Sequence, residues 1–268
     1  MSSSNSNNIT SNSITTTSTS AHGLIMQVVT SSNIISNNIS TAGNTVHGIY
    51  ALSSSNSNNF VSNNITTLGN TAYGIFLSSV NSNNLTSNNI RTSGTSAGAI
   101  VLSASSSSNV RLNNISTSGA TSDGIFIGAN TNLNAISNST VTVTGAGSTG
   151  INVYSATNNF TIVDSVLNAS SGIGLYISSS VNGIWNFTNI TQLDGNPIVV
   201  NWSAGSNGTL NMHWYLSAKT NYTNGSDFPG VNVTAWDVYG NKAFNVLSDS
   251  SANLRTRDNS AGCMTRFK

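Results

Sequence analysis

The stretch Ser53–Leu77 reads SSSNSNNFVSNNITTLGNTAYGIFL, and most of roughly the first 190 residues are copies of it. The preceding copy, over 31–52, reads SSNIISNNISTAGNTVHGIYAL, and the following copy, over 78–102, reads SSVNSNNLTSNNIRTSGTSAGAIVL. A unit that recurs at a fixed spacing is typical of a solenoid, in which each copy forms one coil and stacks on its neighbours. This repeat therefore determines the fold class before any single residue is considered.

The composition limits the classes of partner. Only 6% of the residues are charged, the net charge is +1, and Glu is absent. This balance gives no electrostatic attraction to nucleic acid or to an anionic membrane. A polar, weakly charged chain can be disordered, but the regular spacing of Ile, Leu, Val and Phe indicates a folded core. The single cysteine, Cys263, excludes disulfides and cysteine-based metal sites as organising features.

The sequence shows neither a transmembrane segment nor a signal peptide. No run of about 18 apolar residues predicts a transmembrane helix. Met1 is followed by SSSNSNN rather than by a basic and then an apolar segment, so no signal peptide is visible. Because Asn8 and Ile9 already occupy repeat positions, we expect a fragment whose N-terminal coil is truncated.

Three apolar columns run through the repeat. The first column is Ile9, Ile34, Phe60, Leu85, Val110, Ala135, Phe160 and Trp185. The second column is Ile14, Ile39, Ile65, Ile90, Ile115, Val141, Val166 and Ile190. The third column follows a glycine and is Leu24, Ile49, Ile75, Ala99, Ile125, Ile151 and Ile173. The first column covers 176 residues in seven steps, about 25 per coil, so each coil is predicted to contain three short strands.

The short, β-branched segments exclude helices, and the repeat length selects among β-solenoids. Helical repeats are longer, at 33 residues or more. A coil of about 25 residues with three strands predicts a right-handed parallel β-helix, which also has the hand preferred for parallel crossovers. The fold class is therefore all-β.

Polar columns accompany the apolar ones. Asn residues directly precede the first and second columns, where they suit turns and can hydrogen-bond from coil to coil as stacked amides. The first set is Asn33, Asn59, Asn84, Asn109, Asn134 and Asn159, and the second is Asn38, Asn64, Asn89 and Asn114. A Thr column follows two residues after the second apolar column and is predicted to point inward: Thr16, Thr41, Thr67, Thr92 and Thr117.

The repeated motif, [S/N]-N-x-hydrophobic-x-x-N-N-I-x-T-x-G…G-I-x-hydrophobic, carries a resemblance. Residues from about 5 to 191 resemble the right-handed parallel β-helix repeats of cell-surface proteins and carbohydrate-active enzymes. That superfamily includes pectin and alginate lyases, polygalacturonases, phage tailspikes, adhesins and a periplasmic copper-processing group. The resemblance implies the fold and leaves the activity open, because one fold supports many functions.

The pattern changes after Ile190, where aromatic residues and all three lysines gather. Three strands are predicted, over 210–218, 231–236 and 243–247. The run PGVNVTAWDVYGNKAFNVLSDSS, over 229–251, resembles small Ig-like or prealbumin-like β-sandwich modules, whose D-x-x-G turn matches Asp237–Gly240. The glycine usual after 248–250 is absent, and RTRDNSAGCMTRFK, over 255–268, has no strand pattern.

These boundaries divide the chain into four segments. We predict β-helix repeats over 1–191, a transition over 192–212, a small, incomplete β-sandwich-like module over 213–255, and an irregular tail over 256–268.

Candidate catalytic and metal-binding residues are sparse. A lyase or glycosidase needs clustered carboxylates on neighbouring coils. The charged residues of the repeat region lie on different edges, and we expect isolated, solvated charges and no catalytic residue: Arg91, Arg111, Asp123, Asp164 and Asp194. His22 and His47 are equivalent, so their rings can stack one coil apart, and Tyr73 and Asp123 continue that column. A metal needs three or four converging ligands, so we expect an exposed ladder of turn residues, with no metal and no cofactor.

A row of large apolar residues is the strongest functional feature. Strand alternation points it outward: Ile25, Tyr50, Phe76, Ile100 and Phe126, ending at Asn152 and Gly174. A contiguous apolar row usually marks a partner or ligand surface, although another domain or chain could cover it. The predicted binding residues are Tyr50, Tyr73, Phe76, Ile100 and Phe126.

The function predicted from these features is a non-enzymatic, adhesin-like scaffold that is secreted or attached to the cell surface. It would bind a polysaccharide or a surface protein along one face, with no nucleic acid partner. The alternative is a polysaccharide lyase or glycoside hydrolase whose catalytic coils lie outside this chain. Ice binding through Thr ladders is less favoured, because Arg91 interrupts the outward column Thr15, Ser40 and Thr66.

Overall fold

The computed structural model describes residues 1–154, 156–157, 159–170, 172–178, 181–236 and 242–257. Its contacts divide the chain into two compact units. The first unit comprises 1–185 and 190–209, and the second comprises 186–189 and the described residues from 210 onward. Every regular element in the described residues is a β-strand.

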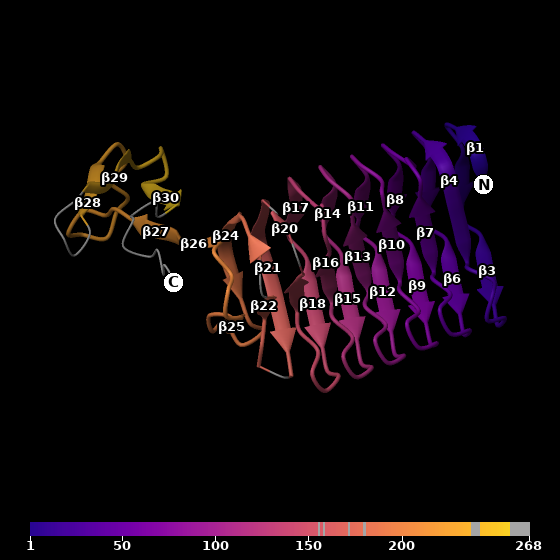
Figure 1. Cartoon of the computed structure of the whole chain (residues 1–268). Coiled ribbons are helices and arrows are strands. Elements are labelled where there is room, and N and C mark those ends of the chain that lie inside the picture. Colours follow the sequence, from indigo (N-terminus) through magenta and orange to yellow (C-terminus); the bar gives the residue numbers. More distant parts are fainter. Residues whose placement is uncertain (155, 158, 171, 179–180, 237–241, 258–268) are drawn as a thin grey trace. The chain divides into compact units, whose positions relative to one another are not determined.

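The first unit is a parallel β-helix of about 8 coils (Figure 1). One of its faces is a nine-stranded sheet, in which each strand pairs in parallel with the equivalent strand of the next coil. In order, these strands are β1 (Ser2–Asn5), β4 (Leu24–Thr30), β7 (Ile49–Leu52), β10 (Ile75–Ser78), β13 (Ile100–Ser103), β16 (Ile125–Ile127), β19 (Ile151–Val153), β22 (Leu175–Ile177) and β25 (Val200–Trp202). We call this the first sheet.

The second sheet contains two rows of strands, so each coil contributes three strands, as predicted. The first row is β2 (Asn8–Thr10), β5 (Asn33–Ile35), β8 (Asn59–Val61), β11 (Asn84–Thr86), β14 (Asn109–Arg111) and β17 (Asn134–Ser137). The second row is β3 (Ser13–Thr16), β6 (Asn38–Thr41), β9 (Asn64–Thr67), β12 (Asn89–Thr92), β15 (Asn114–Thr117) and β18 (Thr140–Val143). The longer β21 (Phe160–Ala169) pairs with both β17 and β18 and so joins the rows. The chain also forms β20 (Ala156–Thr157), β23 (Val181–Asn182) and β24 (Ile184–Thr191).

In several coils a serine, and not one of the paired asparagines, takes the left-handed backbone between the two rows of the second sheet, whereas Leu112 and Asn138 take it in later coils. Ser36, Ser62 and Ser87 have φ values of 55°, 54° and 56°. Each precedes an Asn pair, so the left-handed residue turns the chain and the asparagines that follow are free to pair between coils. The predicted backbone role of Asn is therefore wrong for the paired asparagines, although Asn138 does take the left-handed backbone, with a φ of 48°.

The asparagine ladders themselves are confirmed, and there are more of them than predicted. On the surface, the side-chain amide of an Asn donates to the side-chain carbonyl of its equivalent one coil earlier, for example Asn59 to Asn33 at 2.9 Å and Asn64 to Asn38 at 2.8 Å. The predicted place of Asn134 in this ladder is wrong, because Asn134 is buried and donates to the Ser105 backbone carbonyl. The first Asn of each pair forms a second ladder inside the coil: Asn37, Asn63, Asn88 and Asn113. All four of these side chains are buried.

The core fills with the inward side chains of the three strand rows, with corrections to the predicted columns. Parallel register aligns Ile75 with Ile100 and Ile151 with Leu175. The third column therefore contains Ile100 and Leu175 in place of Ala99 and Ile173. In the other two columns, Ile136 replaces Ala135, Ile162 replaces Phe160 and Leu167 replaces Val166. These coils carry longer apolar runs, in which alternation alone does not decide which residue points inward.

The inward Thr column is confirmed for the coils that follow the first, where Thr41, Thr67, Thr92 and Thr117 are buried. The Thr67 hydroxyl donates to the Ala72 carbonyl and the Thr117 hydroxyl to the Ser122 carbonyl, both at 2.7 Å. In the described part of the chain the buried hydroxyls of Thr41 and Thr92 have no hydrogen-bond partner, which costs free energy.

The second unit contains short antiparallel pairs. Its strands are β26 (Thr209–His213), β27 (Tyr215–Lys219), β28 (Asn232–Trp236), β29 (Lys242–Leu247) and β30 (Asn253–Arg257). β27 pairs with β30, and β28 pairs with β29 across a register irregularity at Ala235 and Trp236. These two pairs form separate two-stranded sheets and do not by themselves make a β-sandwich, so the sandwich stays a prediction. The predicted turn Asp237–Gly240 lies outside the described residues.

Two sequence predictions in this unit are wrong. The strand predicted over 210–218 is two strands, β26 and β27, and part of the supposedly patternless 255–268 belongs to β30. Antiparallel pairing with β27 holds β30, and Leu254 at its start is buried. A short strand fixed by one partner needs no alternating pattern of its own.

Candidate functional site

The outward row of the first sheet is an array of large side chains. Register aligns Ile25 with Tyr50, Tyr50 with Phe76, Phe76 with Val101, and Val101 with Phe126. We call these five residues the outer row. The row continues through Asn152, Tyr176 and Asn201, so its predicted continuation at Gly174 is wrong.

Ile100 does not belong to the outer row, which corrects one predicted binding residue. It pairs with Ile75 and is fully buried, while Val101 takes the outward position. The run Ala99–Leu102 is apolar throughout, so the sequence offered no contrast between inward and outward residues. The other predicted residues lie on the outer face, with Tyr73 just before β10.

A second row lies beside the outer row, at the residues that precede the strands of the first sheet. Backbone hydrogen bonds align successive coils here, for example from the Gly23 amide to the His47 carbonyl and from the Gly74 amide to the Gly98 carbonyl. This register places one residue of each coil in what we call the turn row: His22, His47, Tyr73, Gly98, Asp123 and Thr149.

Rings of the two rows stack along the solenoid and against each other. The ring centroids of His22 and His47 are 4.9 Å apart with planes tilted by 38°, whereas His47 and Tyr73 stack at 4.9 Å with planes 10° from parallel. Tyr50 and Phe76 stack at 5.0 Å and 3°. Between the rows the contacts are edge-to-face, as for Tyr73 and Phe76 at 5.4 Å and 78°. Both geometries are favourable for aromatic pairs and hold these rings in fixed positions.

The imidazoles of the turn row also bond the backbone. Nδ1 of His22 accepts the amide proton of His47 at 2.8 Å, and Nδ1 of His47 accepts that of Tyr73 at 3.1 Å. An accepting Nδ1 carries no proton, so the hydrogen bonds favour the neutral ring. Burial, and secondarily the charge of His22, lowers the pKa of His47 to about 4. His47 is buried, so the expected ladder exists but is not fully exposed.

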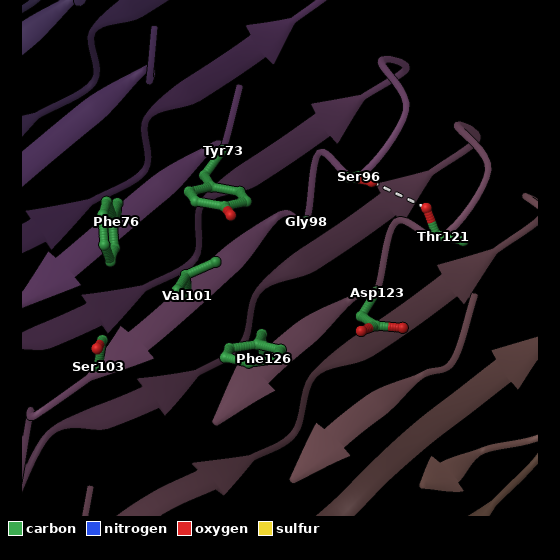
Figure 2. A pocket seen from close by; sticks show the side chains of 9 residues that line it. All are labelled: Tyr73, Phe76, Ser96, Gly98, Val101, Ser103, Thr121, Asp123 and Phe126. Carbon is green, nitrogen blue, oxygen red and sulfur yellow. Dashed lines mark hydrogen bonds between the residues drawn. The ribbon is translucent and has the colours of Figure 1, made fainter. Parts of the chain in front are cut away.

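The rings stop at one coil, and a hollow opens there. Gly98 occupies the turn row and Val101 the outer row where the preceding coils carry rings, and Asp123 and Phe126 follow on the next coil. Figure 2 shows Tyr73 and Phe76 on one side of Gly98 and Val101, with Asp123 and Phe126 on the other. The open hollow has a volume of about 310 Å³. We call it the Gly98 hollow, and Ser96, Ser103 and Thr121 complete its lining.

Asp123 supplies the only carboxylate that lines the hollow within the described residues. Its Oδ1 accepts the Thr149 amide at 2.8 Å and the Thr149 hydroxyl at 2.9 Å, and its Oδ2 accepts the Asn152 side-chain amide at 2.7 Å. Burial raises the pKa of this carboxyl, and the three hydrogen bonds oppose that rise. The residue is half-buried. The prediction of a solvated charge is therefore wrong for Asp123.

A second hollow, of about 270 Å³, lies on the other side of Asp123. Asn152, Tyr176 and Asn201 of the outer row line it, together with Thr149 and Ile173. The Tyr176 hydroxyl is 2.8 Å from the Ser203 hydroxyl, which fixes the phenol. The candidate site is therefore a chain of two hollows along one face, with Asp123 between them.

The sequence predicted most of the aromatic residues of the site but not the residues that form the hollow between them. Tyr50, Tyr73, Phe76 and Phe126 were predicted, whereas Gly98, Val101 and the half-buried carboxylate of Asp123 were not. A signal was present, because Gly98 directly precedes Ala99 where three earlier coils carry His, His or Tyr before a glycine.

Three further observations concern metal ligands, membrane spans and known proteins. Within the described residues, no group of three or more His, Cys, Asp or Glu could hold a metal ion. No described helix is long and apolar enough to cross a membrane. No protein-family model matches the chain, and no curated protein or solved structure gives a significant match.

Proposed function

We propose that the β-helix is a non-enzymatic binding scaffold that holds a polysaccharide or a surface protein along the outer face of its first sheet. The observation that carries this proposal is the set of ring side chains on outward positions of successive coils. The core is filled by the inward residues of the same strands, so it does not need these rings. Rigid, half-exposed rings offer large contact area at a low cost in side-chain entropy.

The scaffold supports such a role because the coils position the rings at a regular spacing. Parallel strands lie about 4.8 Å apart, so each coil presents its outward side chains one strand spacing from the last. A ligand with its own repeat, such as a glycan chain or an extended peptide, can contact several coils at once. Affinity then accumulates over many weak contacts.

The test replaces two members of the outer row, Phe76→Ser and Phe126→Ser, in one chain. Retention of glycans on an array, or of protein partners from a cell surface, should fall about tenfold or more, since two apolar contacts are lost. Leu68→Ser is the matched control, because Leu68 is 53% exposed and belongs to neither row. Unchanged retention with a folded double variant would contradict the proposal.

A second candidate function is a polysaccharide lyase or glycoside hydrolase, which the half-buried carboxyl of Asp123 in a hollow favours. A carboxyl with a raised pKa can serve as a general acid. Release of unsaturated or reducing sugars from polysaccharides, lost in Asp123→Asn, would support this enzyme over the scaffold.

The remaining proposals concern the whole chain. We infer a right-handed solenoid, because crossovers between parallel strands strongly prefer that hand. The antiparallel pairs of the second unit are compatible with an incomplete Ig-like sandwich. A polar, weakly charged surface of Asn, Ser and Thr fits a secreted or cell-surface protein of adhesin type.

A further inference from the structure

We propose that the Gly98 hollow binds a planar cation, the guanidinium group of an arginine side chain on a protein partner. The cation would stack on the ring of Tyr73 and hydrogen-bond to Oδ2 of Asp123. This inference rests on the proposed function, because it concerns the same face, and it names the chemistry recognised at one position of that face.

The first argument is that one ring is missing from a row of evenly spaced rings. His22, His47 and Tyr73 follow one another in the turn row, with 4.9 Å between successive centroids. Gly98 continues this row without a side chain, and Asp123 follows one coil later. Two strand spacings, roughly 10 Å, therefore separate the positions of Tyr73 and Asp123 along the solenoid. A flat group at the Gly98 position would lie at about the same stacking distance from Tyr73 as the rings before it.

The second argument is the negative charge of Asp123, which lines the hollow on the side opposite Tyr73. The described contacts of Asp123 come from neutral donors, the amide and hydroxyl of Thr149 and the side-chain amide of Asn152. Oδ2 accepts only one of these bonds, whereas a carboxylate oxygen can accept about two. Within the described residues, Asp123 has no ion pair. A half-buried carboxylate without a cation is unfavourable, and a bound cation would remove that cost.

The third argument selects guanidinium over ammonium and over a neutral sugar. Guanidinium is flat, is weakly hydrated and stacks on aromatic faces while it donates hydrogen bonds at its edge. An ammonium group is compact and cannot fill a ring-shaped layer. A sugar ring could stack on Tyr73 but would leave the charge of Asp123 uncompensated. The aromatic wall and the carboxylate wall together therefore fit a planar cation best.

The experiment titrates the protein with N-acetyl-arginine amide and follows backbone amide signals by NMR. Saturable shifts are expected at Gly98, Asp123 and Thr149. N-acetyl-lysine amide should bind several-fold more weakly, because a compact ammonium cannot stack flat on Tyr73 while it donates to Asp123. Methyl glucoside should bind more weakly than the arginine probe.

Two variants locate the site. Asp123→Asn keeps an acceptor for Thr149 and should weaken arginine binding about tenfold, as expected when a charge-assisted hydrogen bond is lost. Gly98→Tyr should abolish binding, because the new ring fills the vacant layer. The backbone of Gly98 is outside the left-handed region, and a Cβ would approach the Asp123 carbonyl oxygen at 3.1 Å, so a small shift accommodates it. Leu68→Ser should bind as the parent does.

Several outcomes would overturn the inference. These are no saturable shift with the arginine probe, equal binding by the Asp123→Asn variant, or tighter binding of methyl glucoside. If the probe fails while Phe76→Ser with Phe126→Ser still removes partner retention, only this inference falls. If the probe binds and the double variant retains its partner, the proposed scaffold function falls instead.

Discussion

At the scale of the residue, the neutral imidazole of His47 couples the ring stack to pH. The folded-state pKa of His47 is lowered from 6.5 to about 4, so the folded protein resists protonation that the unfolded chain accepts. Stability from this group is complete above pH 6.5 and is lost as the pH falls through 6.5 towards 4. The lowered pKa of His47 corresponds to a loss of roughly 3 kcal/mol at most in the free energy of unfolding at low pH.

The measurement is the thermal midpoint against pH for the parent and for His47→Tyr. Tyrosine suits this position, because Tyr73 holds the equivalent position one coil later and does not titrate in this range. The parent should lose midpoint temperature between pH 6.5 and 4, and the variant should lose clearly less. Burial also lowers the pKa of His22, so the thermal midpoint of both proteins should still fall slightly over this pH range. Parallel curves for the two proteins would show that His47 does not carry the effect.

The pH dependence of stability expected from Asp123 is opposite to that expected from His47. Burial raises its folded-state pKa, so its favourable contribution is present at pH values below the unfolded pKa and is lost as the pH rises through the folded value. At neutral pH the charged carboxylate of Asp123 therefore lowers the free energy of unfolding relative to the neutral carboxyl. Residues that lower stability without a packing role are expected at functional sites, which agrees with a ligand that supplies positive charge.

At the scale of the element, the two Asn residues of each pair have different energetic roles. Asn63 is buried, and its side-chain amide donates to the Ile34 carbonyl and to Asn88. Its Oδ1 also accepts the backbone amide and the side-chain amide of Asn37. Asn64 is exposed, and its side chain bonds only along the surface ladder, to Asn38 and from Asn89. The buried amide thus joins three coils through both backbone and side chain.

The expected result is a large difference between neighbouring substitutions. Asn63→Ala should lower the free energy of unfolding by about 3 kcal/mol or more, because several buried groups lose their partners. Asn64→Ala should cost less than about 1 kcal/mol, since water replaces the lost bonds. Chemical denaturation of both variants measures the difference. Similar losses at the two positions would mean that the buried ladder is not a main source of stability.

The strands were predictable where the repeat is regular, because each coil confirms the register of the others. Phe60, Ile65 and Ile75 were all placed inward correctly. The predictions failed at Ile100, where four consecutive apolar residues hide the alternation, and at β30, whose existence depends on pairing with β27. Register in those places is set by hydrogen bonds between segments distant in sequence, which no local pattern encodes.

At the scale of the whole molecule, the candidate site follows from a difference between coils. The rings were visible in the sequence as a column, but a hollow is the absence of a side chain at Gly98 and its meaning depends on what stands on either side. The sequence already placed Tyr73 and Asp123 in one column, but the hollow at Gly98 between them appears only in the structure. Function in this fold therefore lies in departures from the repeat, while stability lies in the repeat itself.

Because the coils contact mainly their neighbours, a whole coil should be removable without loss of the fold. Deletion of residues 86–110 joins Leu85 to Arg111, and register aligns Leu85 with Val110, so the strands still match. This deletion removes Gly98 and Val101 and brings Tyr73 and Phe76 directly against Asp123 and Phe126. Deletion of 35–60 is the matched control, since Ile34 and Phe60 are aligned in the same way and the hollow is kept.

Both shortened chains are expected to fold, with β-rich circular dichroism and a cooperative thermal transition. Only the deletion of 86–110 should lose saturable binding of the arginine probe. If both deletions keep that binding, the vacant layer at Gly98 is not the site. If both unfold, the coils depend on long-range contacts, and stability is not the sum of neighbouring-coil interactions that the solenoid geometry predicts.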